Sequence, residues 1–230
     1  MLDITPITQH PLFGLLLTLL AFRIGQWTYQ RSNQNTFLQP VVVGMTLVII
    51  LLLVIKLPYK VYFESAYLLH LLLGPVTVAL AIPLYQNLKR IRALFLPILG
   101  TLVLGSLLTV TSCLTIAWIL GASETTLEAM TTKSITTPIA MAVAEKIGAT
   151  AALAAPFVMF TGVLGAVIGP LILTRLGIQE DSTKGIALGL TSHAVGTAKA
   201  LEISEECGAF AALSMGLTGI LTALILPFLI

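Results

Sequence analysis

The sequence predicts an all-α polytopic membrane protein whose helices are broken at related places. Of its 230 residues, 57% are hydrophobic and only 10% are charged, a balance that the surface of a water-soluble globular protein does not have. Several uncharged stretches reach the length of about 20 residues that a helix needs to cross a bilayer. These stretches are rich in Leu, Ile, Val and Ala without polar alternation, which favours helices over strands.

Six membrane spans follow from these uncharged stretches, and they form one transmembrane domain over residues 1–230. The first is expected to stay in the mature protein, because no basic cluster precedes it and no small-residue cleavage site follows it. The part before residue 124 contributes four spans, and a broken helix is expected in the third of them. The six spans are residues 4–22, 32–55, 65–88, 93–123, 147–174 and 207–230.

Basic residues predict how the chain is oriented. The densest basic cluster is Lys89, Arg90 and Arg92, and short loops rich in Lys and Arg stay in the cytoplasm. This places the N-terminus outside. Arg23 and Arg31 agree with that orientation, whereas Lys56 and Lys60 oppose it. The predicted orientation therefore rests on the larger size of the first cluster.

The C-terminal half contains an apparent duplication, residues 124–174 and 184–230. The run that begins at Ser134 is echoed by the run that begins at Ser192, and each is followed by a long apolar span. Residues 134–144 are uncharged but extend only about 17 Å as a helix, half of a bilayer. If such a segment enters and returns, the two units form inverted repeats, as in many secondary transporters. If it crosses fully, the units are parallel and Arg175 and Lys184 fall outside, so the inverted arrangement is preferred.

Three segments combine helix breakers with hydroxyl groups, and each predicts a helix start inside the membrane. A helix start carries free N–H groups and a partial positive charge, which attract an anion. Thr137 before Pro138 has the chemistry of an N-cap followed by a helix-opening proline. The alternative is that the prolines and glycines only kink continuous helices. The candidate substrate-binding residues are Gly74, Pro75, Thr77, Thr136, Thr137, Pro138, Ser192, His193, Gly196, Thr197 and Lys199.

Ionisable residues follow two of these breaks, where they are costly in lipid unless they are functional or paired. His193 is expected to carry a coupling proton or to donate to a carboxylate, because an imidazole ionises near neutral pH; it could instead be a packing residue. Lys199 could neutralise an anion or extend to the interface. Glu145 and Glu202 could carry protons or simply pair with neighbouring lysines.

Other classes of function find no support in the sequence. There is no phosphate-binding loop, no metal-ligand spacing and no catalytic triad, so we expect no enzyme activity, no metal and no cofactor. Cys113 and Cys207 lie in or beside apolar spans and are interpreted as packing residues. A net charge of +2 without a basic polar domain gives no indication of nucleic-acid binding.

Four motifs resemble those of the LrgB/CidB family, which includes bacterial inner-membrane proteins and a related plastidic glycolate/glycerate translocator. The resemblance covers nearly the whole chain and implies a fold similar to that of cation/proton antiporters and anion transporters. Where the family pattern more often has Arg, this sequence has Lys199, which weakens the expectation of two-point carboxylate binding. The motifs are LLLGPVTVALAIPLY from Leu71, KSITTPIAMAVAEKIG from Lys133, TGVLGAVIGP from Thr161 and GLTSHAVGTAKALE from Gly189.

The resemblance implies two functions of different classes. The leading hypothesis is a secondary carrier that moves a small monocarboxylate such as glycolate, glycerate or pyruvate by alternating access. The alternative is a holin-like or antiholin-like protein that modulates murein hydrolase activity and autolysis beside a small LrgA/CidA-type membrane partner. An ion channel is a third possibility. We expect a multi-pass protein of the bacterial inner membrane that forms a homo-oligomer, with a dimer favoured.

Overall fold

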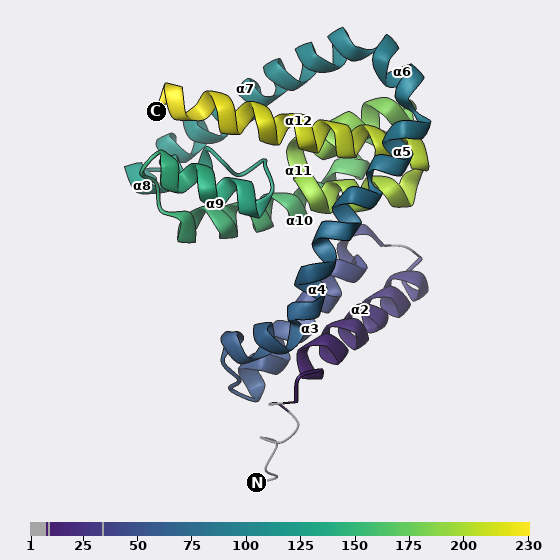
Figure 1. Cartoon of the computed structure of the whole chain (residues 1–230), viewed down its shortest axis with the longest axis vertical. Coiled ribbons are helices and arrows are strands. Elements are labelled where there is room, and N and C mark those ends of the chain that lie inside the picture. Colours follow the sequence, from purple (N-terminus) through teal and green to yellow (C-terminus); the bar gives the residue numbers. More distant parts are fainter. Residues whose placement is uncertain (1–7, 9, 34) are drawn as a thin grey trace. The chain divides into compact units, whose positions relative to one another are not determined.

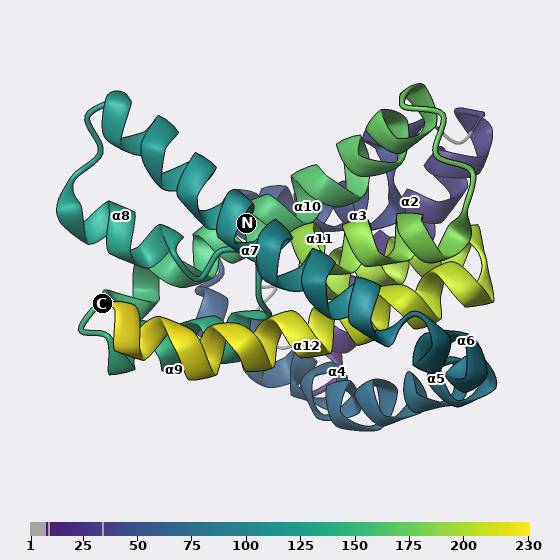
Figure 2. The same cartoon turned by 90° about the horizontal axis from the view of Figure 1, so that it is seen from above.

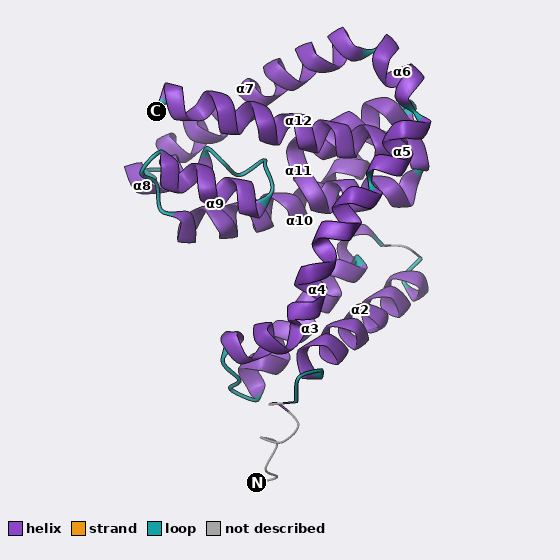
Figure 3. Cartoon of the chain, viewed as in Figure 1, coloured by secondary structure: helices purple, strands orange, loops and turns teal. Residues whose placement is uncertain are grey.

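The computed structural model describes residue 8, residues 10–33 and residues 35–230. Every regular element among these residues is a helix (Figures 1 and 3). They fall into two compact units, the first ending at Ala79 and the second spanning Leu80–Ile230. That both units form a single domain stays a prediction.

The first unit contains α2 (Phe13–Arg31), the short 3₁₀ helix η1 (Thr36–Leu38), α3 (Pro40–Val54) and α4 (Tyr59–Ala79). Small residues bring α2 close to both neighbours. Gly25 lies against the backbone of Pro40, and the Gly14 amide donates to Ser65 Oγ at 2.9 Å. Glycines permit such backbone contact between helices in a membrane, where packing replaces the hydrophobic driving force.

The second unit consists of three long helices with interrupted segments between them. It contains α5 (Ala81–Gln86), α6 (Leu88–Ala93), α7 (Phe95–Ile119), α8 (Glu124–Met130), α9 (Thr137–Lys146), α10 (Ala151–Arg175), α11 (Asp181–Ile203) and α12 (Glu205–Leu229). Within this unit, α5 and α6 lie at one end of the long helices, whereas α8 and the C-terminus lie at the other (Figures 1 and 2).

Four helices among the described residues are long and apolar enough to cross a membrane, so the chain is a multi-pass membrane protein. They are the stretch Tyr59–Gln86, which comprises α4 and α5, and the helices Phe95–Ile119, Ala151–Arg175 and Glu205–Leu229. Each coincides with a predicted span. The second predicted span appears as α3, an apolar helix of only 15 residues.

The first predicted span, residues 4–22, has the wrong bounds. The helix in this region is α2, which begins at Phe13 and continues through Arg23 to Arg31. The prediction ended the span at the first charge, but arginine is a good helix former and its long side chain can reach a polar surface. Residues 4–7 and 9 lie outside the described residues.

The predicted helix start at Gly74 and Pro75 is also wrong. The helix α4 runs from Tyr59 to Ala79 with Pro75 in its interior. A proline inside a helix removes one backbone hydrogen bond and crowds the carbonyl four residues earlier, and membrane helices tolerate this when neighbouring groups compensate. The alternative of a proline within a continuous helix therefore holds at this position.

The helix α11 is a hairpin and not a straight rod. Its backbone leaves the helical region at His193, with φ 41° and ψ −130°. Ser204 Oγ donates to Asp181 Oδ2 at 2.7 Å, although 23 helical residues in a row would separate these positions by about 34 Å. The two arms, residues 181–192 and 194–203, therefore run antiparallel and return to the same end.

Glycines on α10 give the hairpin room to approach. A Cβ atom at Gly162 would lie 2.5 Å from the ring carbon Cε1 of His193, and one at Gly169 would lie 2.8 Å from Leu188 Cδ2. A Cβ atom at Gly165 would overlap Ser192 Oγ. The side of the hairpin that faces α12 is also made of glycines, since Gly185 and Gly189 lie against the α12 backbone.

Candidate functional site

The first break separates α8 from α9 and lies in residues 131–136. The predicted helix start there is confirmed, because α9 begins at Thr137 and Pro138 occupies its first turn. The N-cap is Thr136 and not Thr137, and its side chain makes no capping hydrogen bond. The backbone amides at the start of α9 thus keep the unsatisfied character that the anion-binding hypothesis needs.

Lys133 lies in this break and was not among the predicted site residues. It is buried, with 9% of its surface exposed, and its ammonium group donates to Ser134 Oγ at 3.1 Å. In the sequence it only marked the end of an uncharged stretch. The signal that could have identified it is a lysine four residues before a Thr-Pro helix start.

The second break is the tip of the α11 hairpin at His193. The imidazole is buried, and its Nε2 atom hydrogen-bonds the carbonyl oxygen of Val158 on α10 at 2.9 Å. Because a carbonyl only accepts, Nε2 carries the proton in this arrangement. The predicted break in this segment is confirmed, and the ring is held against α10.

The hydroxyl groups around the tip bond mainly within the hairpin, although Thr197 Oγ1 also donates to Met215 Sδ on α12 at 3.7 Å. Ser192 Oγ lies 3.0 Å from Thr191 Oγ1, and Thr197 Oγ1 donates to the His193 carbonyl at 2.9 Å. Gly196 allows the second arm to approach the Leu188 carbonyl of the first. Ser192, His193, Gly196 and Thr197 are all buried, so the structure brings these four predicted residues together.

Both breaks contact the same turn of α10. Ile135 from the first break packs with Val158 in one buried cluster, and His193 from the second break bonds the Val158 carbonyl. The contacts are also reciprocal. Gly162 on α10 receives His193, while Gly219, its counterpart in the duplicated sequence, faces Ile139 of α9. Each long helix, α10 and α12, therefore contacts the interrupted segment of the other duplicated segment.

The structure pairs two of the predicted ionisable residues. Lys199 forms an ion pair with Glu202, with 2.7 Å between Nζ and Oε2. This agrees with the alternative that the two residues neutralise each other. Glu145 is exposed near the end of α9, and no ion pair with Lys146 is found within the described part of the chain.

The remaining predicted site residues lie elsewhere. Gly74 and Pro75 are exposed positions of α4 in the first unit, and the Thr77 side chain lies outside the described residues. Their role in binding stays a prediction. The described residues contain no group of three His, Cys, Asp or Glu side chains that could hold a metal ion.

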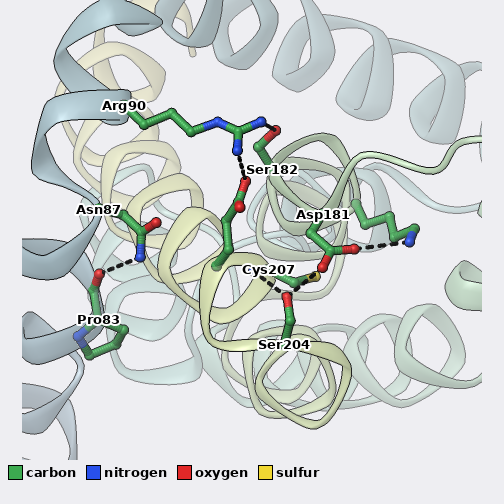
Figure 4. A network of polar contacts seen from close by, with 9 residues as sticks. Pro83, Asn87, Arg90, Asp181, Ser182, Ser204 and Cys207 are labelled. Atoms are coloured by element: carbon green, nitrogen blue, oxygen red, sulfur yellow. Dashed lines mark hydrogen bonds and ion pairs between the residues drawn. The ribbon is translucent and has the colours of Figure 1, made fainter.

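A polar network closes the open end of the hairpin (Figure 4). Ser204 Oγ accepts from the Cys207 amide at the start of α12 while it donates to Asp181. The Ser204 hydroxyl and, after it, Lys184 lower the pKa of the Asp181 carboxyl group below its ordinary value. Arg90 of α6 forms an ion pair with Glu206 at 2.8 Å and reaches Ser182. The basic segment of α6 is thereby joined to the base of the hairpin.

The family model described as the LrgB-like family matches residues 18–230. This chain belongs to the LrgB family. It is 32% identical over 216 residues to the holin-like protein CidB of Staphylococcus epidermidis, covering 94% of both chains. It is 30% identical over 220 residues to the antiholin-like protein LrgB of Bacillus cereus, covering 96% of both. The YwbG protein of Bacillus subtilis is 35% identical over 217 residues. No solved structure matches the chain.

As an LrgB family member, the chain has relatives of nearly its own length, so the likeness includes both units. The motifs that indicated the family contain both breaks, the Thr-Pro start of α9 and the tip of α11. The names of the relatives describe holin-like and antiholin-like proteins. They make no statement about a transported solute.

Proposed function

We propose that this protein is a holin-like or antiholin-like protein of the bacterial inner membrane that controls murein hydrolase activity and autolysis. The observation that carries the proposal is the near-complete coverage of CidB and LrgB relatives that bear these names. The four apolar helices support a membrane location. A small LrgA/CidA-type membrane protein is the partner we propose, because the family resemblance implies such a pair.

Deletion of the gene in its own bacterium tests this proposal. Loss of the protein should change the rate of detergent-induced autolysis and the murein hydrolase activity seen on zymograms, and plasmid-borne protein should restore both. The partner is tested by co-purification with the small membrane protein from mildly solubilised membranes. Unchanged autolysis and unchanged hydrolase activity after deletion would contradict the proposal.

A second candidate, a carrier of a small organic anion, is favoured by one structural observation. Two interrupted segments meet at one turn of α10, and one of them is a hairpin with a buried histidine at its tip. Interrupted helices at mid-membrane are the usual means by which secondary transporters hold a substrate. The two functions are compatible if the flux of an organic acid changes the membrane potential or the pH difference across the membrane.

We also propose that the duplicated segments, residues 124–174 and 184–230, are inverted relative to one another, which would support the carrier. Arg90 contacts the base of the hairpin, so the basic segment of α6 and the loop after α10 share one surface, which the positive-inside rule assigns to the cytoplasm. The helices α8 and α9 have 7 and 10 residues and are too short to cross the bilayer. If α7 and α10 both cross, this first interrupted segment enters from the outside and the hairpin enters from the cytoplasm.

Purified protein in liposomes tests the carrier. Labelled glycolate or pyruvate should move down its gradient, at a rate that falls at least about tenfold when His193 is replaced by Gln. The same variant separates the two functions when it is returned to the deletion strain. Normal autolysis without flux would show that the control of autolysis does not depend on transport.

A further inference from the structure

A groove in the first unit lies at the end of α3 and the turn that leads into α4. Its volume is about 440 Å³, within the range of about 300 to 1,000 Å³ that is typical of small-molecule pockets. Apolar side chains of α3 line one part of it, and the turn supplies one cation and one aromatic ring. The lining includes Ile49, Leu52, Leu53, Lys56, Pro58 and Tyr59.

The groove changes from apolar to polar along the direction of α3. From Ile49 to Lys56 the chain advances by about 10 Å, if each residue contributes the rise of a helix. The helix α3 is uncharged and apolar, so Ile49 lies on the hydrocarbon side and Lys56 on the side of the polar boundary. Tyr59 is of the type that collects at this boundary. The two ends of the groove therefore match the two parts of a phospholipid.

The backbone holds Lys56 at the polar end of the groove. Its φ is 54°, in the left-handed region that favours glycine. The Leu57 amide donates to the Leu52 carbonyl at 3.0 Å, and the Lys56 amide donates to the Leu53 carbonyl at 3.3 Å. This is the Schellman ending of a helix, in which glycine normally occupies the position of Lys56. A lysine is present despite the strain, which indicates a use for its charge.

Aromatic packing holds the Tyr59 side of the groove. The centroid of the Tyr59 ring lies 6.1 Å from that of Tyr62 and 5.8 Å from that of Phe63. Tyr62 is attached in turn to α2, because its hydroxyl group shares a hydrogen bond of 2.8 Å with Thr18 Oγ1. Both sides of the turn are thus fixed by the protein, so the groove is preformed.

The lysines near this turn are not neutralised by ion pairs. Lys60 lies in the first turn of α4, which contains no acidic residue. None of the three ion pairs found in the described part of the chain includes Lys56 or Lys60. These two lysines also oppose the orientation that the basic cluster of α6 predicts, so the positive-inside rule does not account for them. An anion that binds from outside the chain would neutralise them.

We propose that this groove binds one phospholipid whose headgroup carries a net negative charge, of the phosphatidylglycerol type. Its phosphate contacts Lys56, Lys60 adds to the positive potential, and one acyl chain follows the apolar side chains of α3. Phosphatidylethanolamine is a weaker ligand, because its ammonium group cancels the charge of its phosphate. The site goes beyond both proposed functions and depends on neither of them.

Thermal unfolding of the delipidated full-length protein in an uncharged detergent tests the site. Phosphatidylglycerol at about ten times its Kd should raise Tm by roughly 3 to 6 °C. Phosphatidylethanolamine with the same acyl chains should raise it much less, and glycerol phosphate, which has the charge without the chains, should not raise it. In native mass spectrometry, Lys56→Gln should weaken the binding of phosphatidylglycerol about fivefold, the loss expected for one lysine near the membrane surface.

Matched variants separate the charge of Lys56 from its part in folding. Lys56→Gly should not lower the Tm of the lipid-free protein, because glycine fits the positive φ, and yet it should lose the preference for phosphatidylglycerol. Lys56→Arg should keep most of the preference. Lys146→Gln removes an exposed lysine at the end of α9 in the second unit and should leave the preference unchanged.

The apolar part of the groove is tested by Leu53→Trp. Leu53 is 72% exposed, so a larger side chain can be accommodated, and it should weaken phosphatidylglycerol binding by filling the groove without a change of charge. Equal stabilisation by the two phospholipids, or a preference that survives in Lys56→Gln, would overturn the site. Stabilisation by glycerol phosphate as large as that by phosphatidylglycerol would also overturn it, because the ligand would then be a free anion and not a lipid.

Discussion

At the scale of single residues, His193 has the most unusual backbone in the hairpin. Its φ of 41° with ψ of −130° resembles the first central position of a type II′ turn, which glycine normally occupies. A non-glycine residue there costs about 1 to 3 kcal/mol. The sequence offers Gly196 as the natural break, three residues later. The structure instead uses Gly196 for the close approach of the two arms.

This backbone conformation reverses the usual order of stability, in which an alanine variant of a helical residue is more stable than a glycine variant. His193→Gly and His193→Ala both lose the bond to the Val158 carbonyl, but only glycine relieves the strain, so we expect His193→Gly to be more stable by about 1 kcal/mol. This corresponds to a Tm higher by about 2 to 4 °C. Thermal unfolding in detergent measures the difference. Ala198→Gly, in the regular second arm, is the control and should lower Tm, as glycine does in an ordinary helix.

Asp181 makes the stability of the hairpin depend on pH. The pKa of Asp181 is lower in the folded protein than in the unfolded chain, where it is about 4. Its contribution to the free energy of unfolding is therefore complete above about pH 4 and disappears as the pH falls through the pKa of the folded protein. Asp181→Asn should therefore lower Tm at pH 7, and the gap to the wild type should narrow below pH 4. The exposed Glu205→Gln variant should not reproduce this gap. A gap that stays constant down to pH 3 would contradict the role of Asp181.

At the scale of elements, the glycines of α10 decide whether the hairpin can dock. Gly165→Ala would drive a methyl group into Ser192 Oγ, and overpacking of this kind costs about 1 to 3 kcal/mol. We expect a lower Tm and weaker protection of the hairpin in hydrogen exchange. Adding Ser192→Gly should recover part of the loss. Gly100→Ala on α7, where nothing lies within 4 Å of the new atom, should be neutral or stabilising.

The two arms of α11 can be shown to be antiparallel by cross-linking. With Cys113 and Cys207 replaced by Ala, the pair Asp181→Cys and Ser204→Cys should form a disulfide under mild oxidation, because these side chains are in hydrogen-bond contact. The faster migration of the cross-linked chain in electrophoresis measures the bond. The pair Asp181→Cys and His193→Cys, at opposite ends of one arm, should stay reduced. A straight α11 would give no cross-link with either pair.

At the scale of the whole molecule, composition predicted the membrane class, and long uncharged stretches located α7, α10 and α12 to within a few residues. These features follow from the hydrocarbon thickness, which any span must match. Polar residues next to helix breakers located both interruptions of the second unit. Whether a charge has a partner depends on tertiary contacts between distant residues, so the sequence could not distinguish the paired Lys199 from the buried Lys133.

The sidedness of the second unit can be tested by labelling single cysteines with an impermeant maleimide. Glu180→Cys and Ser204→Cys flank the hairpin and should react from the same surface of sealed vesicles. Thr150→Cys, before α10, and Ile230→Cys, after α12, should react from the opposite surface, because each lies across one 25-residue helix from the hairpin. Labelling of all four from one surface would contradict the hairpin topology.

The glycines that line the hairpin also set how this protein can change over evolutionary time. Lipid-facing positions of α7 can exchange one apolar side chain for another, since they meet only hydrocarbon. Gly162, Gly165, Gly185 and Gly189 have no such freedom, because any larger residue would clash with the His193 and Ser192 side chains or with the backbone of α12. Selection on this fold should therefore permit rapid drift on the outside and keep the smallest residues fixed within.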